Sequence, residues 1–146
     1  KNNTTGSILD KIARNKLKKM HLDYAHGTGH GVGYFLNVHE GPQSISKFNK
    51  IKLKPGMILS NEPGYYEKGN FGLRIENLIY IKKYKKGMRF ENLTYVPIDK
   101  SLIIKNLLDE KEVYWFNQYH RNVFKKLKKY MNKRELAMLR DSCSNI

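Results

Sequence analysis

Residues 57–81, MILSNEPGYYEKGNFGLRIENLIYI, place two apolar runs on either side of a glycine-rich segment. The first run, MILSNEP, is typical of a short strand that ends at Pro63. The second run, residues 73–81, alternates side chains between two faces as a single strand does. Because GYYEKGNFG has the composition of a hairpin connection, the segment predicts two strands in an antiparallel sheet.

Helices are predicted on both sides of this segment. Residues 7–20 have apolar side chains at helical spacing, and Ser7 with Asp10 forms an S-x-x-D start signal. The glycine-rich segment that follows opposes a helix, and its later part, residues 33–40, favours a strand. Three further elements are predicted, namely a strand over 90–98 and helices over 109–130 and 133–141. The order predicts an α+β fold with a mainly antiparallel sheet.

Composition excludes several classes of protein. The chain has 146 residues, 40% of them hydrophobic, which suits a folded domain, and it contains no apolar run long enough to cross a membrane. Cys143 is the only cysteine, which excludes a disulfide within the chain and fits a reducing compartment. The net charge of +15 comes mainly from lysine rather than arginine, so nucleic-acid binding is not expected.

Three histidines and two glutamates are the candidates for chemistry. His26, His30 and His39 lie within fourteen positions among glycines, upstream of Glu62 and Glu76 in the apolar strands. One imidazole with carboxylates suits Mn, Zn, Fe or Co. The H-E-x-x-H pattern is absent, because HGTGH has the spacing without the glutamate. Spacing alone therefore indicates a possible metal site of a hydrolase.

Each candidate also has a structural explanation. A carboxylate buried alone is costly, so Glu76 could instead form an ion pair with Arg74, which alternation places on the same face. Glu62 could lie at a solvated sheet edge, and a lone histidine in a strand-forming stretch is most often packed in the core. Taken singly, each explanation outweighs catalysis. Three histidines together with two carboxylates shift the balance toward a possible metal site.

Four motifs together resemble aminopeptidase P, the X-prolyl aminopeptidase of the pita-bread metallopeptidase family. They are HGTGHGVG, VHEGP, NEPGYY and RIEN, in this order. The resemblance runs from Ile8 into LLDEKEVYWFNQYH, whose tail is typical of the long eukaryotic type rather than of prolidase or methionine aminopeptidase. It implies that residues 1–106 form the C-terminal half of a pita-bread catalytic domain with a curved sheet and flanking helices. Residues 107–146 would form a helical C-terminal extension.

The resemblance also implies roles for the candidates in removing the N-terminal residue from peptides with proline in second position. His30, Glu62 and Glu76 match the ligands of two divalent metal ions, with Mn²⁺ expected and Zn²⁺ or Co²⁺ as alternatives. Glu62 also matches a general base for the attacking water. The remaining residues match substrate contacts: His39 steadies or protonates the proline-side amine, His26 lines the pocket beyond the scissile bond, and Arg74 braces the site. Tyr65 and Tyr66 are candidates for the wall of the proline pocket.

One departure from the family pattern concerns two aspartate ligands. Asp10 and Asp23 are the only acidic residues before His30, and neither has the strand context that these ligands require. The chain is therefore expected to be the C-terminal part of a longer enzyme whose upstream part completes the site. A homodimer in the cytoplasm is expected, with an acidic digestive compartment as the alternative location. The alternative function is a catalytically inactive pita-bread module that binds peptides or proteins, against which the retention of all three ligands argues.

Overall fold

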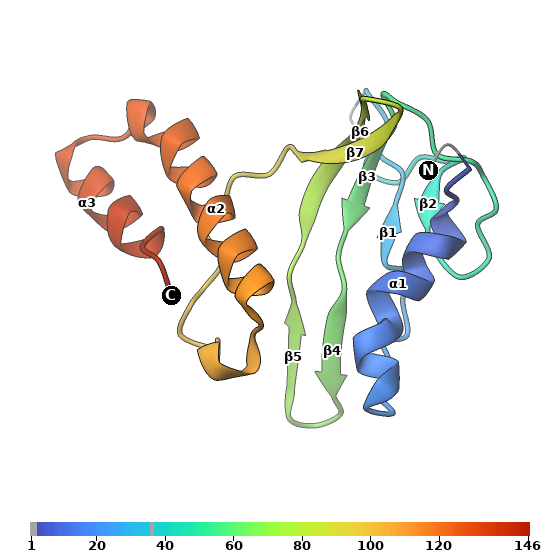
Figure 1. The fold of residues 1–146 in the computed structure, drawn as a ribbon, viewed down its shortest axis with the longest axis horizontal. Coiled ribbons are helices and arrows are strands. Elements are labelled where there is room, and N and C mark those ends of the chain that lie inside the picture. The colour runs from blue at the N-terminus through green and yellow to red at the C-terminus, as the bar shows by residue number, and fades with distance from the viewer. Residues whose placement is uncertain (1–2, 36) are drawn as a thin grey trace. The chain divides into compact units, whose positions relative to one another are not determined.

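The computed structural model describes residues 3–35 and 37–146, and the chain forms two compact units, Lys1–Thr94 and Tyr95–Ile146. The first unit contains one helix and the strands, and the second contains the remaining helices (Figure 1). The domain boundary expected between residues 106 and 107 stays a prediction. Within the described ranges, no helix combines the length and the apolar character that crossing a membrane requires.

The strands of the first unit form three antiparallel groups. They are β1 (Gly29–His30), β2 (Ser44–Ile45), β3 (Ile58–Asn61), β4 (Gly64–Glu67), β5 (Phe71–Arg74), β6 (Asn77–Tyr84) and β7 (Gly87–Asn92). β1 pairs with β2, β6 lies between β3 and β7, and β4 pairs with β5. A bridge between Gly31 and Leu59 connects the β1 segment to β3. The prediction of a mainly antiparallel sheet is confirmed.

The single strand predicted over residues 73–81 is wrong, because the chain leaves the ladder at Ile75 and Glu76. Figure 1 shows β4 following β3, and β5 running into β6, on either side of this break. Asn61 pairs with Asn77 and Gly64 with Arg74, so both ladders share one register and Glu62 falls opposite Glu76. Pro63 explains the break, since proline has no N–H to donate to a ladder. The segment GYYEKGNFG, predicted as a connection, contains β4 and the start of β5, which pair as a separate hairpin.

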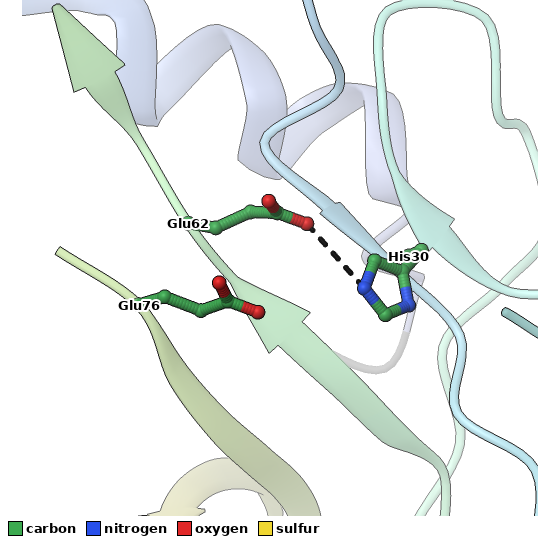
Figure 2. A group of neighbouring side chains, drawn as sticks. All are labelled: His30, Glu62 and Glu76. Carbon is green, nitrogen blue, oxygen red and sulfur yellow. Dashed lines mark ion pairs between the residues drawn. The ribbon is translucent and has the colours of Figure 1, made fainter. Parts of the chain in front are cut away.

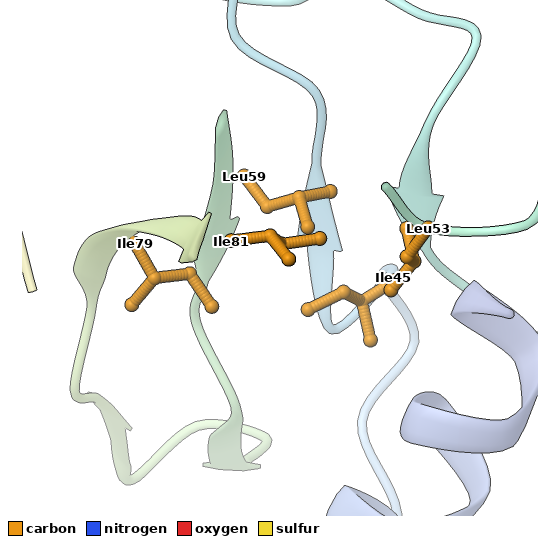
Figure 3. Close-up of a cluster of buried hydrophobic side chains, with 5 residues drawn as sticks. All are labelled: Ile45, Leu53, Leu59, Ile79 and Ile81. Carbon is orange, nitrogen blue, oxygen red and sulfur yellow. The ribbon is translucent and has the colours of Figure 1, made fainter. Parts of the chain in front are cut away.

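Helix α1 (Gly6–Lys19) confirms the predicted N-terminal helix, but its start differs from the prediction. Thr5 is the N-cap residue, and Asp10 is buried in an ion pair with Arg14 instead of marking the helix start. Residues 33–35 and 37–40 form a loop rather than the predicted strand, and Leu36 lies outside the described residues. Leu9 of α1 packs against the hydrophobic core, which Figure 3 shows as Ile45, Leu53, Leu59, Ile79 and Ile81.

The second unit consists of α2 (Glu110–Leu127), α3 (Lys133–Ser142) and the short 3-10 helices η1 (Lys105–Leu107) and η2 (Lys128–Tyr130). Both predicted helices are confirmed, and each begins with a capping box that satisfies its first backbone N–H groups. The strand predicted over 90–98 is only partly correct, because β7 ends at Asn92. The core of this unit is Tyr119, Val123, Leu139 and Cys143.

His120 makes the stability of the second unit depend on pH. It is fully buried, its Nε2 accepts a hydrogen bond from the Ile98 N–H at 2.9 Å, and burial lowers its pKa, with the charge of Lys100 acting in the same direction. Between the folded pKa and the unfolded value of about 6.5, the unfolded chain binds more protons. Stability is therefore fully present above the unfolded value and decreases as the pH falls through it, by at most about 1.4 kcal/mol per pH unit.

The measurement is urea unfolding at pH 7.5 and pH 5.0, followed by the fluorescence of Trp115, the only tryptophan of the chain. We expect a lower midpoint at pH 5.0, and a smaller difference between the two pH values in His120→Gln, which keeps an acceptor for Ile98. An equal pH dependence in both proteins would show that other groups are responsible.

Candidate metal centre

His30, Glu62 and Glu76 converge in the first unit. His30 ends β1, Glu62 directly follows β3 and Glu76 directly precedes β6. Each residue offers one ligand atom, and these atoms all lie within 4.8 Å of one another. In Figure 2 both carboxylates extend toward the same side as the His30 ring, and His30 Nε2 lies 3.5 Å from Glu62 Oε1.

The break in the ladder brings the two carboxylates together. Since Glu62 and Glu76 occupy opposite positions of one register, their side chains extend into a shared space. Like charges directly opposite each other are destabilising unless a cation lies between them. Glu62 is buried, with 9% of its surface exposed, so the solvated edge considered for it is wrong; Glu76 is exposed, unlike a residue inside a strand. The pair can thus bind a cation from solvent.

The imidazole of His30 is oriented as a metal ligand would be. Its Nδ1 lies 3.0 Å from the Gly31 carbonyl oxygen, which only accepts hydrogen bonds, so Nδ1 carries a proton. Nε2, which faces Glu62 at 3.5 Å, is then the nitrogen that could bind a metal ion. A backbone carbonyl that fixes the tautomer in this way is typical of metal-binding histidines. An imidazole nitrogen with carboxylate oxygens suits Mn, Zn, Fe or Co, so the donor set fits part of such a centre.

Glu62 is held by two donors. Ser60 Oγ donates to Glu62 Oε1 at 2.9 Å and accepts a hydrogen bond from the His30 N–H at 2.9 Å. Arg74 Nη1 donates to Glu62 Oε2 at 3.2 Å, so Arg74 forms its ion pair with Glu62 rather than the one considered with Glu76. Ser60 thus connects His30 to Glu62, and both carboxylate oxygens of Glu62 have fixed directions.

A hydrogen-bonded chain extends from Arg74 to His26. Arg74 Nε donates to the Tyr66 hydroxyl at 2.9 Å, and this hydroxyl lies 2.8 Å from His26 Nε2. His26 Nδ1 donates a hydrogen bond to the Gly27 carbonyl at 2.8 Å, so His26 Nε2 accepts the hydrogen bond from the Tyr66 hydroxyl. The hydrogen bond that Arg74 donates to Tyr66 raises the pKa of Arg74. Arg74 therefore stays charged while it orients both Glu62 and, through Tyr66, His26.

His39 lies beside the three convergent residues, on the loop that follows β1. Its ring centroid is 4.1 Å from that of His30, and its side chain is exposed. The Glu40 N–H donates to the Gly31 carbonyl at 2.9 Å, which closes this loop next to His30. The structure thus brings together all six residues predicted for the site, with His26 connected to the others through Tyr66. They are His26, His30, His39, Glu62, Arg74 and Glu76. Their roles stay predictions.

Two family models match consecutive parts of the chain. The model of metallopeptidase family M24 matches residues 1–83, which is more than half of the chain, and the model of the C-terminal region of peptidase M24 matches residues 86–146.

The chain belongs to metallopeptidase family M24.

Curated relatives are similar in sequence to more than nine tenths of the chain. The "Probable Xaa-Pro aminopeptidase P" of Botryotinia fuckeliana is 47% identical over 146 residues, which cover 92% of this chain and 22% of the relative. The protein of the same name from Coprinopsis cinerea is 48% identical over 152 residues, covering 95% of this chain and 24% of the relative. The chain thus spans about a quarter of the length of these relatives.

Solved structures match the chain to different extents. The X-prolyl aminopeptidase from Caenorhabditis elegans, described as a cytosolic enzyme with a di-nuclear active site, has a TM-score of 0.90 at 40% identity and covers 99% of this chain and 25% of its own. The prolidase from Pyrococcus furiosus has a TM-score of 0.54 at 37% identity and covers 62% of this chain and 26% of its own. The pita-bread fold and the resemblance to aminopeptidase P are confirmed.

Sequence reasoning missed Ser60 as a residue of the M24 site and gave Tyr66 another role. Ser60 was detectable as a polar residue inside the apolar run MILSNEP, and it is fully buried. Tyr66 was considered only as a wall of the proline pocket. Its contacts with His26 and Arg74 depend on the β4–β5 pairing, which no local pattern specifies.

Proposed function

We propose that this chain supplies much of the active site of an Xaa-Pro aminopeptidase, a hydrolase that removes the N-terminal residue from peptides with proline in second position. The convergence of His30, Glu62 and Glu76 in an M24 chain carries the proposal. Support for this substrate class comes from relatives named Xaa-Pro aminopeptidase P and from the similarity to the C. elegans enzyme over 99% of the chain.

His30 and the two glutamates are the residues that would hold metal. His30 Nε2 offers a lone pair, and Glu62 and Glu76 offer carboxylate oxygens from opposite sides of the ladder break. Two divalent ions are proposed, because the C. elegans structure is described as having a di-nuclear active site, and Mn²⁺ is our expectation for both. When bound, such ions make a water molecule nucleophilic near neutral pH and polarise the scissile carbonyl.

Three side chains also have proposed roles in proton transfer and substrate binding. Glu62 is the proposed general base, because Ser60 and Arg74 hold its carboxylate in one orientation. The exposed imidazole of His39 is proposed to donate a proton to the proline nitrogen as the amide bond breaks. His26, fixed by Tyr66, would line the pocket for the residue beyond that bond. An X-Pro amide has no N–H, so recognition falls on the ring of proline.

Three residues do not complete a centre for two ions. Since the chain spans about a quarter of its curated relatives, we propose that an upstream part of the same enzyme supplies two aspartate ligands. A homodimer in the cytoplasm is the proposed form, and the description of the C. elegans enzyme as cytosolic supports the location.

The test is release of the N-terminal residue from an X-Pro-Pro peptide by the full-length enzyme. We expect release that a chelator abolishes and that Mn²⁺ restores best among Mn²⁺, Zn²⁺ and Co²⁺. The same peptide with alanine in second position is the control and should be cleaved poorly. Binding without release would overturn the proposal and favour the inactive peptide-binding module. Release that a chelator does not affect would overturn the metal-dependent mechanism.

Tyr66→Phe tests the hydrogen-bonded chain between Arg74 and His26. Losing the hydroxyl leaves Arg74 Nε and His26 Nε2 without their common partner, and we expect kcat/KM to fall about tenfold, as for one lost hydrogen bond of about 1.4 kcal/mol. Tyr65→Phe is the matched control: the ring of Tyr65 packs 5.9 Å from that of Phe71, and activity should change less than about twofold. Equal effects of both changes would contradict a role for the Tyr66 hydroxyl.

A further inference from the structure

Helix α1 carries a buried ion pair that packing alone does not explain. Asp10 and Arg14, one turn apart, are 3% and 8% exposed, and Arg14 Nε lies 2.9 Å from Asp10 Oδ2. Removing two charges from water costs several kcal/mol, and well-packed apolar side chains would hold a helix against a sheet equally well. The other contacts of Asp10 and Arg14 therefore have to explain why the pair is buried.

Arg14 uses all three of its nitrogen atoms to hold the segment before His30. Besides Nε, Nη1 donates to Asp23 Oδ1 at 2.6 Å and to the Tyr24 carbonyl at 2.7 Å, and Nη2 donates to the His26 carbonyl at 2.5 Å. The guanidinium also lies 3.9 Å from the centre of the Tyr24 ring. Three residues of a glycine-rich segment are thereby attached to one rigid side chain on a helix.

Asp10 extends the same network to Glu62. Thr28 Oγ1 donates to Asp10 Oδ1 at 2.7 Å, so the Tyr24 hydroxyl, 2.5 Å away, donates to Thr28 Oγ1. Thr28 is fully buried, and its carbonyl accepts the Glu62 N–H at 2.8 Å. The backbone on both sides of Gly27 is thus tied to α1, and Glu62 is tied to that backbone.

We propose that Arg14 is a positioning residue of the active site: together with Asp10 it forms a buried clamp that fixes residues 23–28 and so sets where the imidazole of His26 meets the substrate. The role of His26 rests on the proposed function, whereas the clamp rests on contacts within the chain. Arg14 touches none of the reacting atoms; it acts through the His26 carbonyl, one residue from the tautomer-fixing contact at Gly27.

Arg14→Lys in the full-length enzyme is the first test. Lysine keeps the charge but has a single nitrogen, which cannot reach Asp10, the Tyr24 carbonyl and the His26 carbonyl together. Because His26 lies on the substrate side, we expect KM for the X-Pro-Pro peptide to rise about tenfold while kcat stays within about threefold. Arg89→Lys, which changes an exposed arginine paired with Glu91, is the matched control and should leave both constants unchanged.

A double-mutant cycle separates positioning from general stabilisation. If Arg14 acts through His26, adding Arg14→Lys to His26→Ala should change KM by less than about twofold beyond the single His26→Ala change. Effects that multiply in the double mutant, or a loss of thermal stability and kcat with KM unchanged, would overturn the proposal. If Arg14→Lys does not fold, Asp23→Ala replaces it, because Asp23 is the half-exposed partner of Arg14. Asp23→Ala should raise KM by a smaller factor, and this rise must also disappear when His26 is already alanine.

Amide hydrogen exchange tests the clamp independently of the proposed function. The Tyr24 N–H donates to Asp23 Oδ1 at 2.9 Å, and this acceptor is held by Arg14. Arg14→Lys should speed exchange at Tyr24 by about tenfold or more and leave Ile79 in the core strand β6 unchanged. Unchanged exchange at Tyr24 would overturn the clamp even in an active enzyme. Faster exchange in an enzyme that releases no residue from X-Pro-Pro peptides would overturn the proposed function alone.

Discussion

Glu62→Gln in the full-length enzyme is expected to lower kcat/KM for an X-Pro-Pro peptide by at least about 10³-fold, a barrier increase of about 4 kcal/mol. The amide has the shape of the carboxylate but lacks its negative charge, so it binds a cation weakly and cannot accept a proton. Ser60 can still donate to the amide oxygen, whereas the amide nitrogen would face Arg74 Nη1, donor against donor. One substitution thus removes the proposed ligand, the proposed base and the ion pair with Arg74.

Steady-state kinetics and metal content by mass spectrometry check this result together. Glu67→Gln is the matched control: Glu67 ends β4 on the same hairpin, is exposed, and accepts a hydrogen bond from Asn70 at 3.1 Å. It should retain full activity and metal. A Glu62→Gln enzyme that keeps its metal and loses less than about tenfold in kcat/KM would show that Glu62 is neither ligand nor base.

Leu59→Ala is expected to cause the largest loss of stability, about 2–5 kcal/mol, which corresponds to a decrease in Tm of about 10 °C or more for a unit of this size. Leu59 is fully buried in the core that Figure 3 shows, and its backbone forms the bridge to Gly31. Truncation would leave a cavity in this core beside β3, the strand that carries Ser60 and leads into Glu62, so metal affinity should fall as well.

Thermal unfolding followed by circular dichroism measures this loss, and Leu102→Ala is the control with the same change of side chain. Leu102 is 74% exposed, so its truncation should alter stability by less than about 0.5 kcal/mol. Equal changes in Tm for the two variants would mean that the cluster around Leu59 does not limit the stability of the first unit.

Elements that local pattern specifies were predictable from the sequence. The helical periodicity of residues 7–20, and the run MILSNEP before Pro63, correspond to α1 and β3. The strand predicted over 73–81 failed because alternation continues through Ile75 and Glu76, while the ladder is interrupted by the partner strand at Pro63. A residue's own neighbours in sequence carry no information about a proline across the sheet.

The candidate site shows the same division. His30, Glu62 and Glu76 were selected by residue type and by resemblance, and the structure brings their ligand atoms together. An ion pair of Arg74 with Glu76, two residues away, was considered as the structural alternative, whereas the observed partner is Glu62 across the hairpin. Asp10 was interpreted as a helix signal, although helical spacing also places Arg14 one turn later as a partner; its contact with Thr28 forms only in the folded unit. Contacts between residues that are distant in the sequence could not be predicted from the spacing of residue types.

The interrupted ladder has a mechanical consequence for the enzyme. The β4–β5 hairpin, which carries Tyr66 and Arg74, is joined to β3 and β6 only through Glu62–Pro63 and Ile75–Glu76, and each of these joints contains one acidic side chain. Any flexing at the joints alters the gap between the two carboxylates while the pairs of β3 with β6 remain intact. If a cation binds both carboxylates as proposed, its affinity and the tilt of the hairpin would be linked, so that binding the cation would restrain the hairpin.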